Sequence, residues 1–401
     1  MNRATRSVDS ATLLLADESW LPRIFAMPKN VSARIRDHFV ELSDPRRRKV
    51  TYPLINIVTI AICAVICGAD DFVSIAEFGR KKRKWLSQFL DLRNGIPSHD
   101  RFNAILGAIK PAEFEACLLS WITDLHEITA GQIVAIDGKT LRRSFDAASS
   151  KSAIHMVSAW ATVNQISLGQ VVVDAKSNEI TAIPQLLKIL EIAGCLVTID
   201  AMGCQTKIAQ AILDAKADYV LAVKSHQQTL YDGLAWFFCY NGTFDYDGVS
   251  VSRHETQEKG HGRRETRSYF VCDVPDDLPD RDRWPKLSAI GMAVSETVRD
   301  GKPCYKQRYY ILSKKLSARR FAAAVRSHWS IENRLHWQLD VTFQEDQSRL
   351  RCGHADANFS ILRRTALSLL KNNHSLKVGV KNKRLAAGWD DSYLEQILFG
   401  Q

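Results

Sequence analysis

Residues 133–139 read Ile-Val-Ala-Ile-Asp-Gly-Lys, and residues 196–203 read Leu-Val-Thr-Ile-Asp-Ala-Met-Gly. In each stretch a short apolar, β-branched run ends at an aspartate, Asp137 or Asp200, followed by glycine or a small residue, which predicts a carboxylate at the end of a buried strand. A third acid, Glu332, lies in the helical pattern His-Trp-Ser-Ile-Glu-Asn-Arg-Leu-His-Trp, residues 328–337. Hard cations such as Mg²⁺ prefer oxygen ligands of this kind. The three acids therefore predict a divalent-metal site for phosphoryl transfer.

The residues around these aspartates alternate between short strands and helices. Strands are predicted over 133–136, 154–163, 170–173, 196–199 and 219–223, and helices over 182–193, 206–215 and 228–238. The order β-β-β-α-β-α-β-α is that of a ribonuclease H-like domain, in which acids at the ends of the first and fourth strands meet at one edge of the sheet. Residues 242–312 are polar with alternating segments and predict a β-rich insertion. A helix with Ser317 as its N-cap then runs to about Leu339 and returns Glu332 to the site.

The chain is long enough for more than one compact unit. It has 401 residues, 46% hydrophobic and 24% charged, and single cores seldom exceed ~250–300 residues. We predict an α/β fold: a loosely ordered lead-in (1–30), a helical N-terminal domain (31–129), a ribonuclease H-like catalytic domain with its insertion (130–375), and a basic C-terminal tail (376–401). The tail could clamp DNA or be solvated.

Composition favours an anionic partner and a reducing compartment. The formal net charge is +10, and its clustering favours nucleic acid. The nine cysteines contain no Cys-x-x-Cys pair, which disfavours zinc ribbons and disulfide frameworks. The longest apolar run, 53–69, is shorter than the ~20 residues of a spanning helix and predicts a core helix. The start lacks a signal-peptide pattern, so we expect a cytoplasmic protein.

Several cations and histidines are candidate phosphate contacts. The cluster Arg80, Lys81, Lys82, Arg83 and Lys84 precedes Trp85 and suits the phosphate backbone, although a solvated helix face is an equal alternative. Candidates near the acids are Lys139, Arg142, Arg143, Arg326, His328 and His336.

On a helix, His328, Glu332 and His336 share one face, at i, i+4 and i+8. They could be a metal ligand flanked by phosphate contacts, a zinc site, or an exposed polar stripe. The zinc reading lacks the His-Glu-x-x-His spacing. Trp329 and Trp337 beside them could stack on an unpaired base or pack in the core.

These motifs resemble the DDE transposases of bacterial insertion sequences, and most of all their H-repeat-associated (ISAs-type) branch. The resemblance rests on Ile-Asp-Gly-Lys-Thr-Leu-Arg (136–142), Thr-Ile-Asp-Ala-Met-Gly-Cys-Gln (198–205) and the stretch 328–337 already quoted, with further stretches at 176–180, 218–224, 44–46, 52–54, 67–69 and 95–100. It extends from about Phe39 to Leu370.

The resemblance implies that Asp137, Asp200 and Glu332 form a catalytic triad holding two Mg²⁺ or Mn²⁺ ions. It implies a transposase that cleaves double-stranded DNA at terminal inverted repeats and transfers the strands to a target, working as a dimer or larger assembly. A domesticated or decayed copy that only binds DNA, and a structure-selective nuclease, are the alternatives.

The chain departs from this family pattern at four positions. The broader group often has tyrosine, arginine and lysine at seven before, four before and seven after the glutamate, where this chain has Val325, His328 and Leu339. His226 stands where the branch is expected to have asparagine. The phosphate contacts of this chain therefore need their own assignment.

Overall fold

A computed structural model describes residues 31–47, 50–126, 131–141, 153–173, 178–260, 263–299 and 302–399. Its N-terminal part is helical, as predicted: α1 (Val31–His38), α2 (Leu54–Ile66), α3 (Phe72–Lys81), α4 (Arg83–Leu86), α5 (His99–Ala108) and α6 (Pro111–Leu125). Helix α2 is buried from Asn56 to Ile66, so the long apolar run is a core helix. No helix in the described part of the chain is long and apolar enough to cross a membrane.

The described strands form one mixed sheet of nine, in the order β3-β2-β1-β4-β5-β9-β8-β7-β6. Their bounds are β1 (Ile133–Thr140), β2 (His155–Ala161), β3 (Ile166–Val173), β4 (Leu196–Ile199), β5 (Asp218–Val223), β6 (Val251–Gly260), β7 (Arg263–Asp273), β8 (Ala289–Arg299) and β9 (Lys302–Leu312). Strand β1 is antiparallel to β2 and parallel to β4. This arrangement confirms the predicted α/β class and is consistent with a ribonuclease H-like domain of the DDE type.

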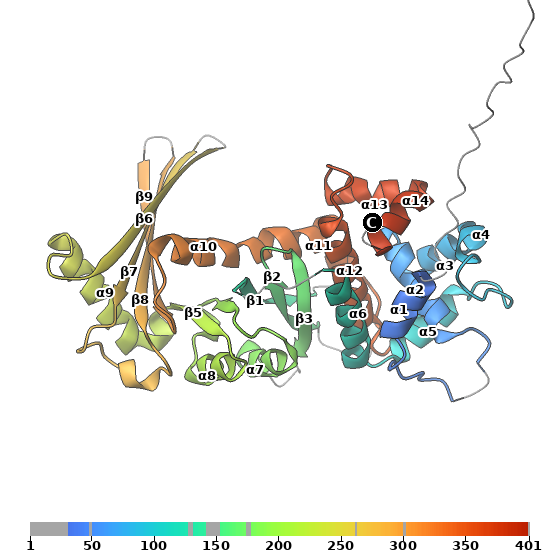
Figure 1. The fold of residues 1–401 in the computed structure, drawn as a ribbon, viewed down its shortest axis with the longest axis horizontal. Coiled ribbons are helices and arrows are strands. Elements are labelled where there is room, and N and C mark those ends of the chain that lie inside the picture. Colours follow the sequence, from blue (N-terminus) through green and yellow to red (C-terminus); the bar gives the residue numbers. More distant parts are fainter. Residues whose placement is uncertain are drawn as a thin grey trace, which may run out of the picture.

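The predicted insertion is not a separate sheet. Strand β9 pairs antiparallel with β5, beginning with Val220 opposite Leu312, so β6–β9 continue the sheet of β1–β5 beyond its β5 edge. In Figure 1 these long strands stand at one end of the molecule, opposite the N-terminal helices. A sequence pattern shows that such strands exist but not which edge they join, because pairing depends on residues far apart in the chain.

Helices cover both faces of the sheet. On one face α7 (Glu179–Ile189), α8 (Thr206–Asp214) and α9 (Gln228–Thr243) share a core with Val134 and Ile136. On the other, α10 (Ala318–His328) packs through Phe321 on Ile133 and Tyr310. Helix α10 begins at the predicted cap Ser317, which accepts from Arg320 N.

Beyond α10 the chain runs through the π-helical turn η4 (Glu332–His336) into α11 (Trp337–Val341). Together they extend from β6–β9 towards the helical end of the molecule (Figure 1). The remaining described short turns are η1 (Ala201–Gly203), η2 (Ser225–Gln227), η3 (Arg281–Arg283) and η5 (Glu345–Gln347).

The C-terminal segment is helical and packed, which differs from the expected tail. Helices α12 (Ala355–Asn372), α13 (Val380–Trp389) and α14 (Asp391–Phe399) share one hydrophobic core with α2–α6. Lys383, expected as a tail cation, is buried and donates to the carbonyl of Leu370 at 2.9 Å. Leu394 and Leu398 are almost fully buried in that core, so apolar burial anchors this segment despite its lysines.

Candidate active site

Asp137 lies within β1 rather than at its end. It pairs with Ser158 of β2 on one side, while the parallel ladder with β4 stops one residue earlier, at Ile136 opposite Ile199. Strand β1 therefore has an open edge from Asp137 onward, on the side where β4 has ended. The strand is longer than predicted because Gly138, Lys139 and Thr140 continue the pairing with β2.

The other two predicted acids lie in the electrostatic surroundings of Asp137. Burial raises the pKa of the Asp137 carboxyl to about 7, a backbone hydrogen bond at Gly138 opposes this rise, and the negative charges of Asp200, Glu179 and Glu332 add to it. Asp200 follows β4 directly and caps η1 by accepting from Gly203 N at 3.4 Å. Glu332 is exposed at the first position of the π-helical turn. The structure thus brings the three acids to one region from the elements that the sequence indicates.

Of the two histidines flanking Glu332, His328 is buried and His336 is largely covered, with 12% of its side chain exposed. His328 Nδ1 lies 3.4 Å from Thr198 Oγ1, and His336 Nδ1 lies 3.6 Å from Asp137 Oδ2. Burial lowers the pKa of both, to about 3 for His336. Both are therefore neutral at pH 7. The 328–336 face is not an exposed polar stripe throughout, because Glu332 is exposed but His328 is buried and His336 is only partly exposed. Neutral imidazoles are also poor phosphate contacts, because such contacts depend on positive charge.

Lys139 is engaged by carboxylates within the protein. Its ammonium pairs with Asp340 and, at 3.0 Å, with Glu345, and its side chain is only 9% exposed. Glu345 is fully buried and also binds Arg364 at 3.1 Å and Ser360 at 2.6 Å. Lys139 therefore ties β1 to α11 and to the turn η5 that follows it, and two carboxylates of the protein already share its charge.

The remaining predicted cations fall into three groups. Arg326 pairs with Glu258 at 3.0 Å. In the basic cluster, Arg80 pairs with Glu77 at 2.7 Å and Lys82 with Asp391 at 2.6 Å, whereas Lys81, Arg83 and Lys84 are exposed. Arg142 and Arg143 lie outside the described residues.

Trp85, which follows the basic cluster, is a core residue. It is buried, and its indole nitrogen donates to Glu395 at 2.7 Å. Stacking on nucleic acid is therefore excluded for this ring in the folded chain.

Sequence reasoning missed the pair Glu179 and His155. Glu179 Oε1 lies 2.7 Å from His155 Nε2, and it would lie 2.0 Å from a Cβ added to Gly138. Any larger residue at position 138 would push the end of the Glu179 side chain aside, so Gly138 leaves the room that this glutamate occupies next to Asp137. The sequence contains a partial sign of this pair, because Glu179 lies in the stretch 176–180 and directly follows Asn178, a helix N-cap. Its partner His155 is distant in sequence, so the pair itself could not be recognised.

The donor chemistry fits a hard divalent cation. Asp137, Asp200, Glu332 and the nearby Glu179 offer only carboxylate oxygens, the ligands that Mg²⁺ and Mn²⁺ prefer. Within the described ranges, no three His, Cys, Asp or Glu side chains are arranged to hold an ion as they stand.

The fold and the acidic site agree with the protein family whose models match this sequence. The family model described as "Transposase DDE domain" matches residues 129–369, and one described as "DDE_Tnp_1-associated" matches residues 36–122. The chain belongs to the DDE transposase family.

Its relatives narrow this to the H-repeat-associated branch. The chain is 43% identical over 367 residues to "Putative transposase YncI" of Escherichia coli O157:H7, covering 90% of this chain and 93% of that one. It is 40% identical over 375 residues to "H repeat-associated putative transposase YhhI" of Escherichia coli K12, covering 92% and 98%. A third relative, "Inactive transposase YbfQ" of the same strain, is 38% identical over 68 residues, 17% of this chain and 81% of the relative.

Proposed function

We propose that this chain cleaves DNA at the terminal inverted repeats of an insertion sequence and transfers the freed 3′ ends to target DNA. The observation that carries the proposal is the crowding of acids around Asp137 at the open edge of β1, where the negative charges of Asp200, Glu179 and Glu332 all raise the pKa of its carboxyl. Like charges are costly to gather in a partly buried site unless a cation binds there. Membership of the DDE family supports the same chemistry.

The catalytic roles follow from position on a ribonuclease H-like scaffold. Asp137, Asp200 and Glu332 would hold two Mg²⁺ or Mn²⁺ ions, which when bound lower the pKa of the attacking water or 3′ hydroxyl and stabilise the leaving oxygen. Asp137 and Asp200 are fixed by the sheet and by the cap of η1. Glu332 is carried on the π-helical turn, a feature frequent at functional sites. His336 contacts Asp137 as a neutral group and orients its carboxylate without adding charge.

The same proposal assigns partners. Double-stranded DNA, as element ends and target, is the substrate, and synapsis of two ends implies a dimer or larger assembly. We place the activity in the cytoplasm, where the DNA is accessible and the cysteines stay reduced.

The test is cleavage and joining on labelled duplexes that carry the DNA flanking this coding sequence, with Mg²⁺ or Mn²⁺. We expect nicks at the element boundary followed by joined products for the wild type, and neither for Glu332→Gln. Glu191→Gln, which changes an exposed glutamate between α7 and β4, is the matched control and should retain both activities. Gel-shift binding should survive in all three proteins.

Two results would redirect the assignment. Specific binding without cleavage in either metal would indicate a DNA-binding protein that does not transpose. Cutting without end preference or joining would indicate a structure-selective nuclease.

A further inference from the structure

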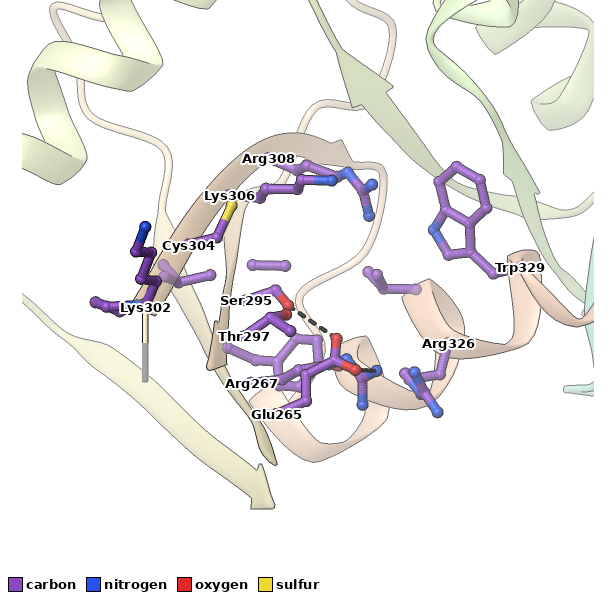
Figure 2. A pocket seen from close by; sticks show the side chains of 15 residues that line it. Glu265, Arg267, Ser295, Thr297, Lys302, Cys304, Lys306, Arg308, Arg326 and Trp329 are labelled. Carbon is purple, nitrogen blue, oxygen red and sulfur yellow. Dashed lines mark hydrogen bonds and ion pairs between the residues drawn. The ribbon is translucent and has the colours of Figure 1, made fainter. Parts of the chain in front are cut away.

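A groove of about 800 Å³ lies between the extended strands β7–β9 and helix α10. Figure 2 shows its floor and walls, with Lys302, Lys306 and Arg308 on β9 and Trp329 after α10. None of the roles proposed above uses this surface. The groove runs along the extended part of the sheet towards the acids, because α10, which forms one of its walls, leads directly to Glu332.

Strand β9 supplies one wall with a row of positive charge. Lys302, Lys306 and Arg308 are all at even positions of one strand and so face the same side. In the described part of the chain, no carboxylate lies within 4.0 Å of these three groups. Cys304 lies between them on the same face and is exposed.

The other arginines of the groove are compensated. Arg267 pairs with Glu265 at 2.6 Å and with Glu258 at 2.9 Å, and Arg326 pairs with Glu258 at 3.0 Å. Figure 2 shows Glu265 held between Arg267 and Ser295. The positive charge that remains for a ligand is therefore the row on β9.

At the end nearest the acids, Trp329 holds Arg308. The guanidinium carbon lies 4.8 Å from the centroid of the indole ring, a cation–π contact that fixes the direction of this long side chain. The ring of Trp329 also packs edge-on against His328, at 5.6 Å between centroids. His328 in turn contacts Thr198, two residues before Asp200. A continuous series of contacts thus links the groove to the acidic edge.

We propose that this groove binds the phosphodiester backbone of the DNA substrate, with Lys302, Lys306 and Arg308 as phosphate contacts and Trp329 as a positioning residue for Arg308. The proposal rests on the proposed function. At about 3.4 Å per residue the row spans roughly 20 Å, which matches about six nucleotides at 3.4 Å per strand. That length exceeds a small phosphorylated ligand and fits a polymer.

The first test is a footprint on the unmodified protein. Cys304 lies in the groove, while Cys239 is exposed on α9, outside it. We expect a duplex to slow alkylation of Cys304 at least tenfold, measured by mass spectrometry, and to leave Cys239 unchanged. Equal rates at Cys304 with and without saturating DNA would overturn the proposal.

The second test measures the salt dependence of duplex binding. Each phosphate contact contributes a slope of about −0.9 to log K against log salt concentration. Lys302→Ala/Lys306→Ala should therefore make the slope shallower by about 1.8, and Trp329→Ala by a smaller amount that Trp329→Phe partly restores. Lys188→Ala, an exposed lysine on α7, is the control and should leave the slope unchanged.

The outcomes separate this proposal from the proposed function. If the salt-dependence slope of Lys302→Ala/Lys306→Ala is unchanged and the protein still cleaves element ends, the groove proposal is overturned and the proposed function stands. A changed slope together with protected Cys304 supports the groove, even in a protein that never cleaves. Circular dichroism of each variant confirms that it is folded before its slope is read.

Discussion

Replacing Glu345 with glutamine should destabilise the protein far more than its small change in shape suggests. The carboxylate is fully buried and is the shared counter-charge of Lys139 at 3.0 Å and Arg364 at 3.1 Å. Those two side chains are only 9% and 3% exposed. After the substitution Lys139 keeps Asp340 as a carboxylate partner, whereas Arg364 loses the carboxylate that it pairs with and cannot recover its hydration. Removing one partner of a buried ion pair typically costs ~3–5 kcal/mol, and we expect a loss of that size in the free energy of unfolding.

Urea unfolding followed by tryptophan fluorescence measures this loss. Glu113→Gln is the matched control, because it removes a glutamate that pairs with Lys110 at 2.7 Å on the surface, where pairs contribute little. We expect the midpoint to shift clearly for Glu345→Gln and hardly at all for Glu113→Gln. Equal, small shifts would refute the argument, since they would mean that water reaches Arg364 when the charge is gone.

The carboxylate of Glu345 also makes the free energy of unfolding depend on pH. Burial raises the pKa of Glu345, but the positive charges of Arg364 and Lys139 outweigh it and hold this pKa below its ordinary value of 4.5. A group whose pKa is lower in the folded than in the unfolded state stabilises the folded protein at pH values above its unfolded pKa. That stabilisation is lost as the pH falls towards the folded pKa. Between pH 5 and 3 the unfolding free energy of the wild type should therefore fall more steeply than that of Glu345→Gln. Parallel curves would contradict this assignment.

Three further substitutions test other parts of the structure. Gly138→Ala places a methyl group 2.0 Å from Glu179 Oε1, so it should displace this glutamate and lower the rate of end cleavage at least tenfold, in a protein whose circular dichroism is unchanged. Ser317→Ala removes the cap that accepts from Arg320 N at 3.3 Å and should cost about 1 kcal/mol in denaturant unfolding, whereas Ser317→Thr should cost less. Leu394→Ala, at a fully buried position of α14, should cost ~2–5 kcal/mol; a negligible loss would show that α14 does not stabilise the helical core.

The elements that carry the candidate site could be predicted because their signals are local. The bounds of β4 and the position of Asp200 follow from a short buried run that ends at a helix-capping acid. The helix after Ser317 follows likewise from its cap and periodicity. These features depend on neighbours within a few residues, which a linear pattern contains.

The roles of several charged residues could not be predicted, because their partners are distant in sequence. Lys139 meets Asp340 and Glu345 across 201 and 206 residues, so its local setting beside Asp137 favoured a phosphate contact. His336 lies in the π-helical turn, which shifts the register of a regular helix and has no sequence signal of its own. Residues 376–401 were predicted as a tail because Lys377, Lys381, Lys383 and Arg384 lie close together near its start. Its burial depends instead on spaced apolar residues such as Leu394.

The shared core of the first and last helices sets an order of events during synthesis. Lys82 and Asp391 are 309 residues apart, and at ~5–20 residues per second the ribosome needs roughly 15–60 s to connect them. During that interval helix α2, whose buried face is almost wholly apolar, has been made but lacks α12–α14. We expect the nascent chain to depend on chaperones over this period, and a chain released before α13 to be a substrate for proteases rather than a small DNA-binding protein.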